Sequence, residues 1–199
     1  MILPTTYMGS VEWYRRFLAI PSSVQIEVME SFPKQTYRNR CTISVPHDSQ
    51  THSPSSIFNR QLPIANRLTL SVPVKRADSK QLTRDVEISY QQKWQHQHWI
   101  ALTSAYKRTP YFDYYADFFR PFYEKETKFL VDLNEGLHET IIRLLTNNVA
   151  ISYGQWAIGE NRTSDWQGLN LESCFGNGQS ILDMLFEYGP EVPLLIQNS

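Results

Sequence analysis

The beginning of the chain carries the pattern that restricts the fold most. ILPTTYM is short, apolar and suited to a strand, VEWYRRFLAI has helical spacing, and VQIEVME alternates with the period of a strand. Strands joined in this way become parallel neighbours, because the helix carries the chain back across the sheet. In the helical run, one side would carry Val11, Tyr14, Phe17 and Leu18. Ligands of such sheets bind at the carboxyl ends of the strands, here around Thr5 to Gly9.

The rest of the chain divides into a β-rich part and a helical part. TYRNRCTISV, NRLTLSVPVKR and RDVEISY are β-rich runs separated by loop chemistry, and after Tyr90 helical periodicity dominates. Before the last helical run, Ser180 is placed to be its N-cap, and YGP ends it. We predict an α/β fold with a mixed sheet, an N-terminal strand-helix-strand unit, an antiparallel excursion and a helical C-terminal half. The alternative is an α+β fold.

Composition limits the domain organisation and the partners. With 199 residues, 41% of them hydrophobic, the chain can bury one substantial core, so we expect a single domain over 1–199. A formal charge of -1 provides no overall field for nucleic acid or an anionic membrane. No apolar run approaches the roughly 18 residues of a membrane span, and no signal-like segment is visible, so we expect a cytoplasmic protein.

Neither the cysteines nor the polar insert predicts a metal site. Cys41 and Cys174 lie far apart and match no metal-ligand spacing, so both are expected to be free thiols. The insert PHDSQTHSPSS (46–56) carries His47 and His52. Its Ser, Thr, Pro and Asp content favours a surface loop over a metal site. We therefore predict no metal, and the sequence identifies no cofactor.

Two histidines stand two positions apart in WQHQHWIALTSAY. On a helix such positions point in nearly opposite directions, so His96 and His98 cannot share a metal ion. His98 shares the face of Trp94 and is expected to point inward, with His96 outward. An inward imidazole is either a hydrogen-bonded core residue or a general base, and a tryptophan beside it serves either packing or sugar stacking.

The run KQTYRNR concentrates positive charge. If it were extended, alternation would place Lys34, Arg38 and Arg40 on one face. Such a group suits a phosphate or carboxylate, with arginine giving bidentate contacts and lysine a point charge. The alternative is a solvated strand face, since edge strands often carry lysine.

Four segments occur in an order that resembles the WbqC-like proteins: KQTYRNRCTI, LTLSVPVKR, DVEISYQQKWQHQHWIALTSAYKRTPYFDYY and SILDMLFEYGPE. The resemblance spans nearly the whole chain. The positions that carry the family's motifs are Lys34, Tyr37, Asn39, Arg40, Pro73, Val74, His98, Ala105, Tyr106, Pro110, Tyr111, Phe112, Ser180, Ile181 and Asp183. At the start, the family's Gln-Pro-x-Tyr-x-Pro-x-x-Gly-Tyr pattern is only partly kept, in Tyr7 and Gly9.

The resemblance implies a role in bacterial surface-polysaccharide assembly of the O-antigen type. We expect a transferase that adds an amino-acyl group, with glycyl as one candidate, or an acyl group to a sugar or sugar nucleotide. The expected catalytic residues are His98 as base and Asn39 as a donor to the oxyanion. The expected substrate-binding residues are Lys34, Arg38, Arg40, Tyr7, Trp94 and Tyr106.

Two other functions fit the same sequence. One is a non-catalytic protein that binds carbohydrate or nucleotide sugar, or an adaptor in an assembly complex, because the many aromatic residues would serve stacking as well as core. The other is a nucleotidyl-transfer fold, although MGSVEWY lacks the histidine that such enzymes place at the first helix. No glycine-rich phosphate loop is present.

Overall fold

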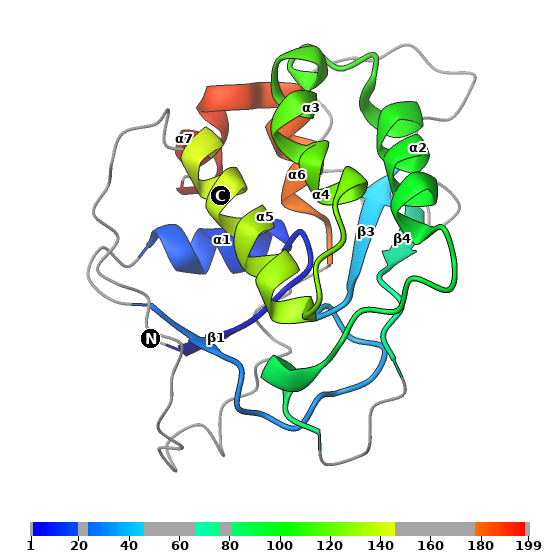
Figure 1. Cartoon of the computed structure of the whole chain (residues 1–199). Helices are drawn as coiled ribbons and strands as arrows, with labels where there is room; N and C mark the ends of the chain where they lie inside the picture. Colours follow the sequence, from blue (N-terminus) through cyan, green and yellow to red (C-terminus); the bar gives the residue numbers. More distant parts are fainter. Residues whose placement is uncertain (1, 20–23, 46–66, 76–80, 146–177, 198–199) are drawn as a thin grey trace.

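The computed structural model describes residues 2–19, 24–45, 67–75, 81–145 and 178–197. The insert at 46–56, with His47 and His52, and also Cys174, lie outside these ranges. The described residues form helices and small sheets, so the predicted mixed α/β class is confirmed (Figure 1).

The N-terminal unit has the predicted form. Strand β1 (Ile2–Pro4) pairs in parallel with β2 (Gln25–Glu27), and helix α1 (Val11–Leu18) connects them. Ser10 begins α1, because its Oγ accepts a hydrogen bond from the backbone N–H of Trp13. The buried side chains of α1 are Trp13, Tyr14 and Phe17, while Val11 and Leu18 are partly buried.

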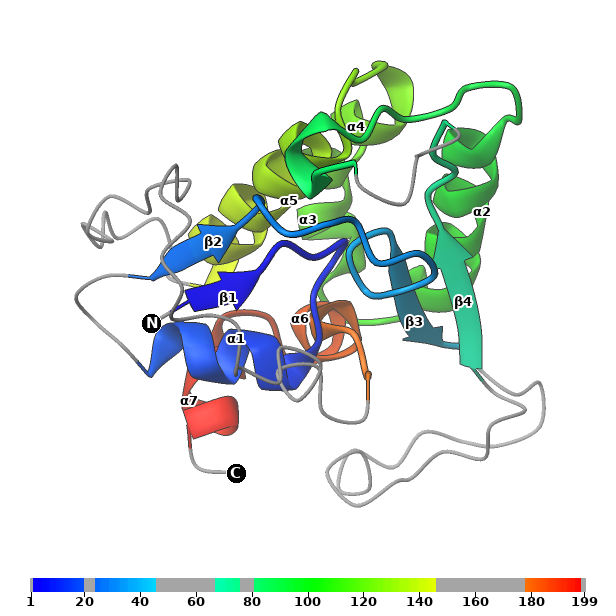
Figure 2. The same cartoon turned by 90° about the horizontal axis from the view of Figure 1, so that it is seen from below.

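The antiparallel excursion is present as a separate pair of strands. Strand β3 (Arg40–Ser44) pairs with β4 (Arg67–Ser71), and within the described ranges this pair and β1–β2 are two distinct two-stranded sheets. The third β-rich run forms the short 3-10 helix η3 (Thr83–Asp85) and isolated bridges, including Val74 to Ile88. Figure 2 shows the two strand pairs at opposite sides of the molecule, with α2 beside β3 and β4.

The helical half begins after Tyr90, as predicted. In chain order it contains α2 (Trp94–Tyr106), α3 (Phe112–Phe119), α4 (Pro121–Glu124), α5 (Leu130–Leu145), α6 (Ile181–Tyr188), the 3-10 helix η6 (Gly189–Glu191) and α7 (Val192–Gln197). Within the part of the chain that the structure describes, no helix has both the length and the apolar character that crossing a membrane requires.

The last helices are joined to the loop that follows β1. Ser180, the predicted N-cap of α6, accepts from the backbone N–H of Leu182 and donates its hydroxyl to the carbonyl of Met8 at 3.1 Å. The N–H of Ile181 donates to the carbonyl of Gly9 at 2.9 Å. The N-terminal loop and the start of α6 therefore complete each other's backbone hydrogen bonds.

The basic run is a series of turns, so the extended conformation on which the shared face of Lys34, Arg38 and Arg40 depended is not formed. Backbone bonding within the turn, from the N–H of Asn39 to the carbonyl of Thr36, replaces strand pairing, and β3 begins only at Arg40. The side chain of Arg38 is 2% exposed and pairs with both carboxylate oxygens of Glu30, at 2.9 and 3.2 Å. A buried charge requires such a partner, and this long-range pairing sets the local conformation.

The Arg38–Glu30 pair gives the first prediction. Arg38→Ala removes the guanidinium that is paired with the buried Glu30 carboxylate, so we expect the free energy of unfolding to fall by about 3 to 5 kcal/mol. Arg120→Ala is the matched control, because Arg120 pairs with Glu124 on the surface, with both side chains 58% exposed. That control should lose less than about 1 kcal/mol. Urea denaturation of both variants measures the free energy of unfolding. If both variants lost the same amount, the prediction would be contradicted.

Candidate functional site

A buried hydrogen-bonded cluster surrounds His98. Its Nδ1 and the hydroxyl of Tyr7 share a hydrogen bond of 2.9 Å, and the Tyr7 hydroxyl shares another, of 3.0 Å, with the hydroxyl of Tyr123. The indole ring of Trp94 lies edge-on to the imidazole, with ring centroids 5.1 Å apart. As expected, His98 faces inward at 5% exposure, whereas His96 on the same helix is exposed. We call His98, Tyr7, Tyr123 and Trp94 the His98 cluster.

The His98 cluster is electrically neutral at ordinary pH. Burial lowers the pKa of His98 to about 4, although a hydrogen bond to the backbone of Ser71 acts in the opposite direction. Burial also raises the pKa of Tyr7 well above its usual value, and the neighbouring Tyr123 adds to this shift. The His98 imidazole is therefore neutral, and it is hydrogen-bonded to the phenol of Tyr7, which is hydrogen-bonded in turn to the phenol of Tyr123.

Within the described ranges, two buried polar atoms of predicted site residues have no hydrogen-bond partner. They are Nε1 of Trp94, which belongs to the His98 cluster, and Oδ1 of Asn39. Asn39 is tied to β4, since its Nδ2 donates to the carbonyl of Val72 at 2.9 Å. Its partnerless atom is thus an acceptor, whereas Trp94 offers a donor. Because buried polar groups are nearly always paired, such atoms are candidates for contacts with a ligand or a water.

The other predicted substrate-binding residues lie in different surroundings. Arg38 is occupied by Glu30, and Tyr106 donates its hydroxyl to Oδ1 of Asp183 at 2.6 Å. Lys34 is exposed, and Arg40 is partly buried, with its Nε donating to the hydroxyl of Ser71 at 3.2 Å. Lys34 and Arg40 are thus better placed than Arg38 to meet an anion from solvent.

The structure brings the β1 exit and the basic turn together. The carbonyl of Tyr37 accepts both the N–H of Tyr7, at 3.0 Å, and the hydroxyl of Thr6, at 3.1 Å. Ser71 links the two sides, because it contacts the Arg40 side chain and its backbone bonds to His98. His98, Tyr7 and Arg40 therefore lie around one junction.

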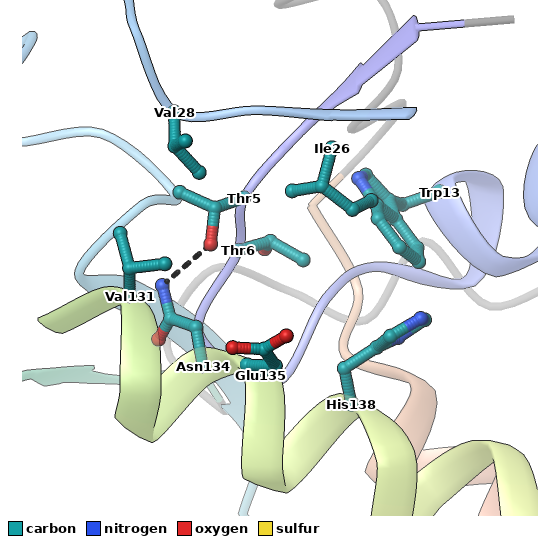
Figure 3. A pocket seen from close by; sticks show the side chains of 9 residues that line it. All are labelled: Thr5, Thr6, Trp13, Ile26, Val28, Val131, Asn134, Glu135 and His138. Atoms are coloured by element: carbon teal, nitrogen blue, oxygen red, sulfur yellow. Dashed lines mark hydrogen bonds between the residues drawn. The ribbon is translucent and has the colours of Figure 1, made fainter. Parts of the chain in front are cut away.

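A pocket opens at the same end of β1, on the side of α5 (Figure 3). It contains about 340 Å³ of empty space, part of which is open solvent. Its lining comes from α1, β2, α5 and the segments that follow β1 and β2: Thr5, Thr6, Trp13, Ile26, Val28, Val131, Asn134, Glu135 and His138. Its location agrees with the predicted ligand-binding edge of the parallel strands, but none of the predicted site residues lines it.

Sequence reasoning missed the polar residues that α5 contributes to this pocket. Asn134 and His138 are four positions apart, on the buried face of an otherwise apolar helical stripe. This i, i+4 pair of polar residues within a buried face was the available signal. His138 shares a 3.2 Å hydrogen bond with the hydroxyl of Tyr14, and burial lowers its pKa to about 3.

Glu135 is the ionisable carboxyl of the pocket. Burial raises its pKa, and the nearby carboxylates of Glu139 and Asp132 raise it further. Asn134 lies beside it and donates from Nδ2 to the carbonyl of Arg38 at 2.8 Å and to Oγ1 of Thr5 at 3.2 Å. Throughout the described ranges, no group of three or more His, Cys, Asp or Glu side chains is placed to hold a metal ion.

Comparison with known proteins identifies the family. The sequence profile of the WbqC-like protein family matches residues 24–167, well over half of the chain. The chain belongs to the WbqC-like protein family. The matched range includes the basic turn, His98 and α5, whereas Tyr7 and α6 lie outside it. No curated protein and no solved structure matches the chain significantly.

The buried imidazole gives a prediction about acid stability. His98 has a pKa of about 4 when folded, against about 6.5 in an unfolded chain, so between these values only the unfolded chain binds the proton. Its contribution to stability is complete above pH 6.5 and is lost as the pH falls towards 4. Between pH 7 and pH 5 this loss is about 2 kcal/mol.

His98→Gln should remove that part of the pH dependence, while His96→Gln, on the exposed face of the same helix, should retain it. Urea denaturation at pH 7 and pH 5 measures the difference. If His98→Gln lost as much stability on acidification as the unmodified protein, the imidazole would not be held neutral by burial.

Proposed function

We propose that this WbqC-like chain is a group transferase of bacterial surface-polysaccharide biosynthesis, acting in the cytoplasm as a single domain. It adds an amino-acyl or acyl group to a sugar or a nucleotide sugar. The observation that carries this proposal is the His98 cluster, where a neutral imidazole is bonded to a chain of phenols and where, among the described residues, Nε1 of Trp94 has no hydrogen-bond partner. Family membership supports the substrate class by resemblance only.

In the proposed reaction, a hydroxyl or amine of the sugar attacks the carbonyl carbon of an activated donor. A bond forms between that oxygen or nitrogen and the carbon, and the donor's leaving group departs with its electron pair. The proton passes along the hydroxyls of Tyr123 and Tyr7 to Nδ1 of His98, since a phenol can accept one proton while it donates another.

Trp94, Asn39, Lys34 and Arg40 would make other contacts with the substrates. Nε1 of Trp94 supplies a donor for the developing oxyanion, a role that sequence reasoning gave to Asn39. Oδ1 of Asn39 instead accepts from the ligand. Lys34 and Arg40 attract phosphate or carboxylate. Because His98 is 5% exposed, substrate binding must displace a neighbouring side chain to reach the cluster.

The proposal predicts a change in the glycan. A bacterium that lacks this chain should make a surface polysaccharide whose repeat unit is lighter by the mass of the transferred group, as measured by mass spectrometry. Reintroducing the unmodified chain or His96→Asn should restore the mass. His98→Asn and Tyr7→Phe should restore less than about a hundredth of it, because general acid-base catalysis contributes 100-fold or more.

Two results would contradict the transferase. If the repeat unit had the same mass with and without the chain, the glycan would not be its product. If the mass depended on the chain but His98→Asn restored it fully, the protein would act as a binding protein or adaptor, the alternative function. Thermal unfolding of each variant serves as the control for folding.

A further inference from the structure

The pocket between β1, β2, α1 and α5 has a chemistry different from that of the His98 cluster. Among the described residues that line it, none is a lysine or an arginine. The neighbouring cation, Arg38, directs its guanidinium to Glu30 and offers only its backbone carbonyl to Asn134. The Glu135 carboxyl also lies near the carboxylates of Glu139 and Asp132. The surroundings are therefore electronegative, and a cation bound here would relieve repulsion between like charges.

The hydrogen-bonding groups of the lining are mainly acceptors. The hydroxyl proton of Thr6 is donated to the carbonyl of Tyr37, so a ligand meets only the lone pairs of that oxygen. The indole N–H of Trp13 is donated to the carbonyl of Pro4, which leaves its ring for contact. A ligand that supplies hydrogen-bond donors therefore suits this lining.

Asn134 forms the wall of the pocket beside Thr5. Its side chain is 2% exposed, and its Nδ2 donates to the carbonyl of Arg38 and to Oγ1 of Thr5. Both amide protons are therefore used within the protein, and Asn134 offers no donor to a ligand.

Size selects among possible cations. The enclosed part of the pocket has room for about one or two water-sized groups. An ammonium group is of that size and carries three donors, whereas a guanidinium is larger and a quaternary ammonium has no donor. The ring of Trp13, on one side of the pocket in Figure 3, provides an aromatic surface of the kind that attracts cations.

We propose that this pocket binds a primary ammonium group, held by the carboxylate of Glu135 and the hydroxyls of Thr5 and Thr6. The inference deepens the proposed function and rests on it only for the source of the ammonium. That source is either the amino-acyl group that is transferred or an amino sugar that accepts it.

The test is an NMR titration of the full chain with glycinamide, which stands for the amino-acyl source, and with glucosamine, which stands for the amino sugar. At least one should cause saturable shifts of the backbone amides of Thr5, Thr6, Asn134 and Glu135. Whichever binds identifies the source. Acetamide lacks the positive charge and tetramethylammonium lacks the donors, so neither should cause saturable shifts.

Two matched variants separate the pocket from general surface charge. Glu135→Gln should weaken binding at least tenfold, while Glu139→Gln should leave it unchanged, because Glu139 is an exposed carboxylate on the same helix outside the pocket. The spectrum without ligand shows whether each variant is folded.

The proposal is overturned if neither amine binds, if acetamide binds equally well, or if Glu135→Gln binds as the unmodified protein does. The pocket would then be a site for water only. The titration requires no turnover, so it can fail while the glycan experiment succeeds, and it can succeed while the transferase proposal fails.

Discussion

The buried ion pair between Arg38 and Glu30 is the interaction on which the rest of the site region depends. It fixes the turn before β3, and the two carbonyls of that turn are then used by other elements. Tyr37 holds the segment that follows β1, through Thr6 and Tyr7, while Arg38 holds α5 through Asn134. One charged contact thereby determines where the first strand, the basic turn and the long helix meet.

The same turn separates two environments of different chemistry. On one side, Tyr7 reaches His98 in a neutral, aromatic enclosure, and on the other, Thr5 and Thr6 face the acidic pocket beside Glu135. Proton transfer favours the first environment, because a desolvated imidazole and phenols remain uncharged. Recognition of a cation favours the second. A reaction that joins two substrates has use for both, at a short distance along the chain.

Sequence patterns predicted the features that depend on neighbouring residues in the chain. The strand-helix-strand unit followed from two periodicities, the N-cap at Ser180 from residue chemistry, and the inward direction of His98 from helical geometry. The turn at 34–39 could not be found in this way. The alternating positive charges fitted one face of a strand, but the direction of the Arg38 side chain depends on Glu30, a carboxylate in a different segment. Likewise, Asn134 gained its role from Thr5, which lies 129 positions away.

The hydrogen bond between Ser180 and Met8 has a consequence for the order of folding. It joins positions 172 residues apart and closes the loop that presents Tyr7. During synthesis, domains fold as the chain emerges, and contacts of such separation form late because loop closure costs entropy. The loop therefore reaches its final conformation only after the residues at the start of α6 are present. A ribosome-bound chain that ends before residue 180 lacks the hydrogen bond to Met8, so the loop that presents Tyr7 is held only after the start of α6 has been made.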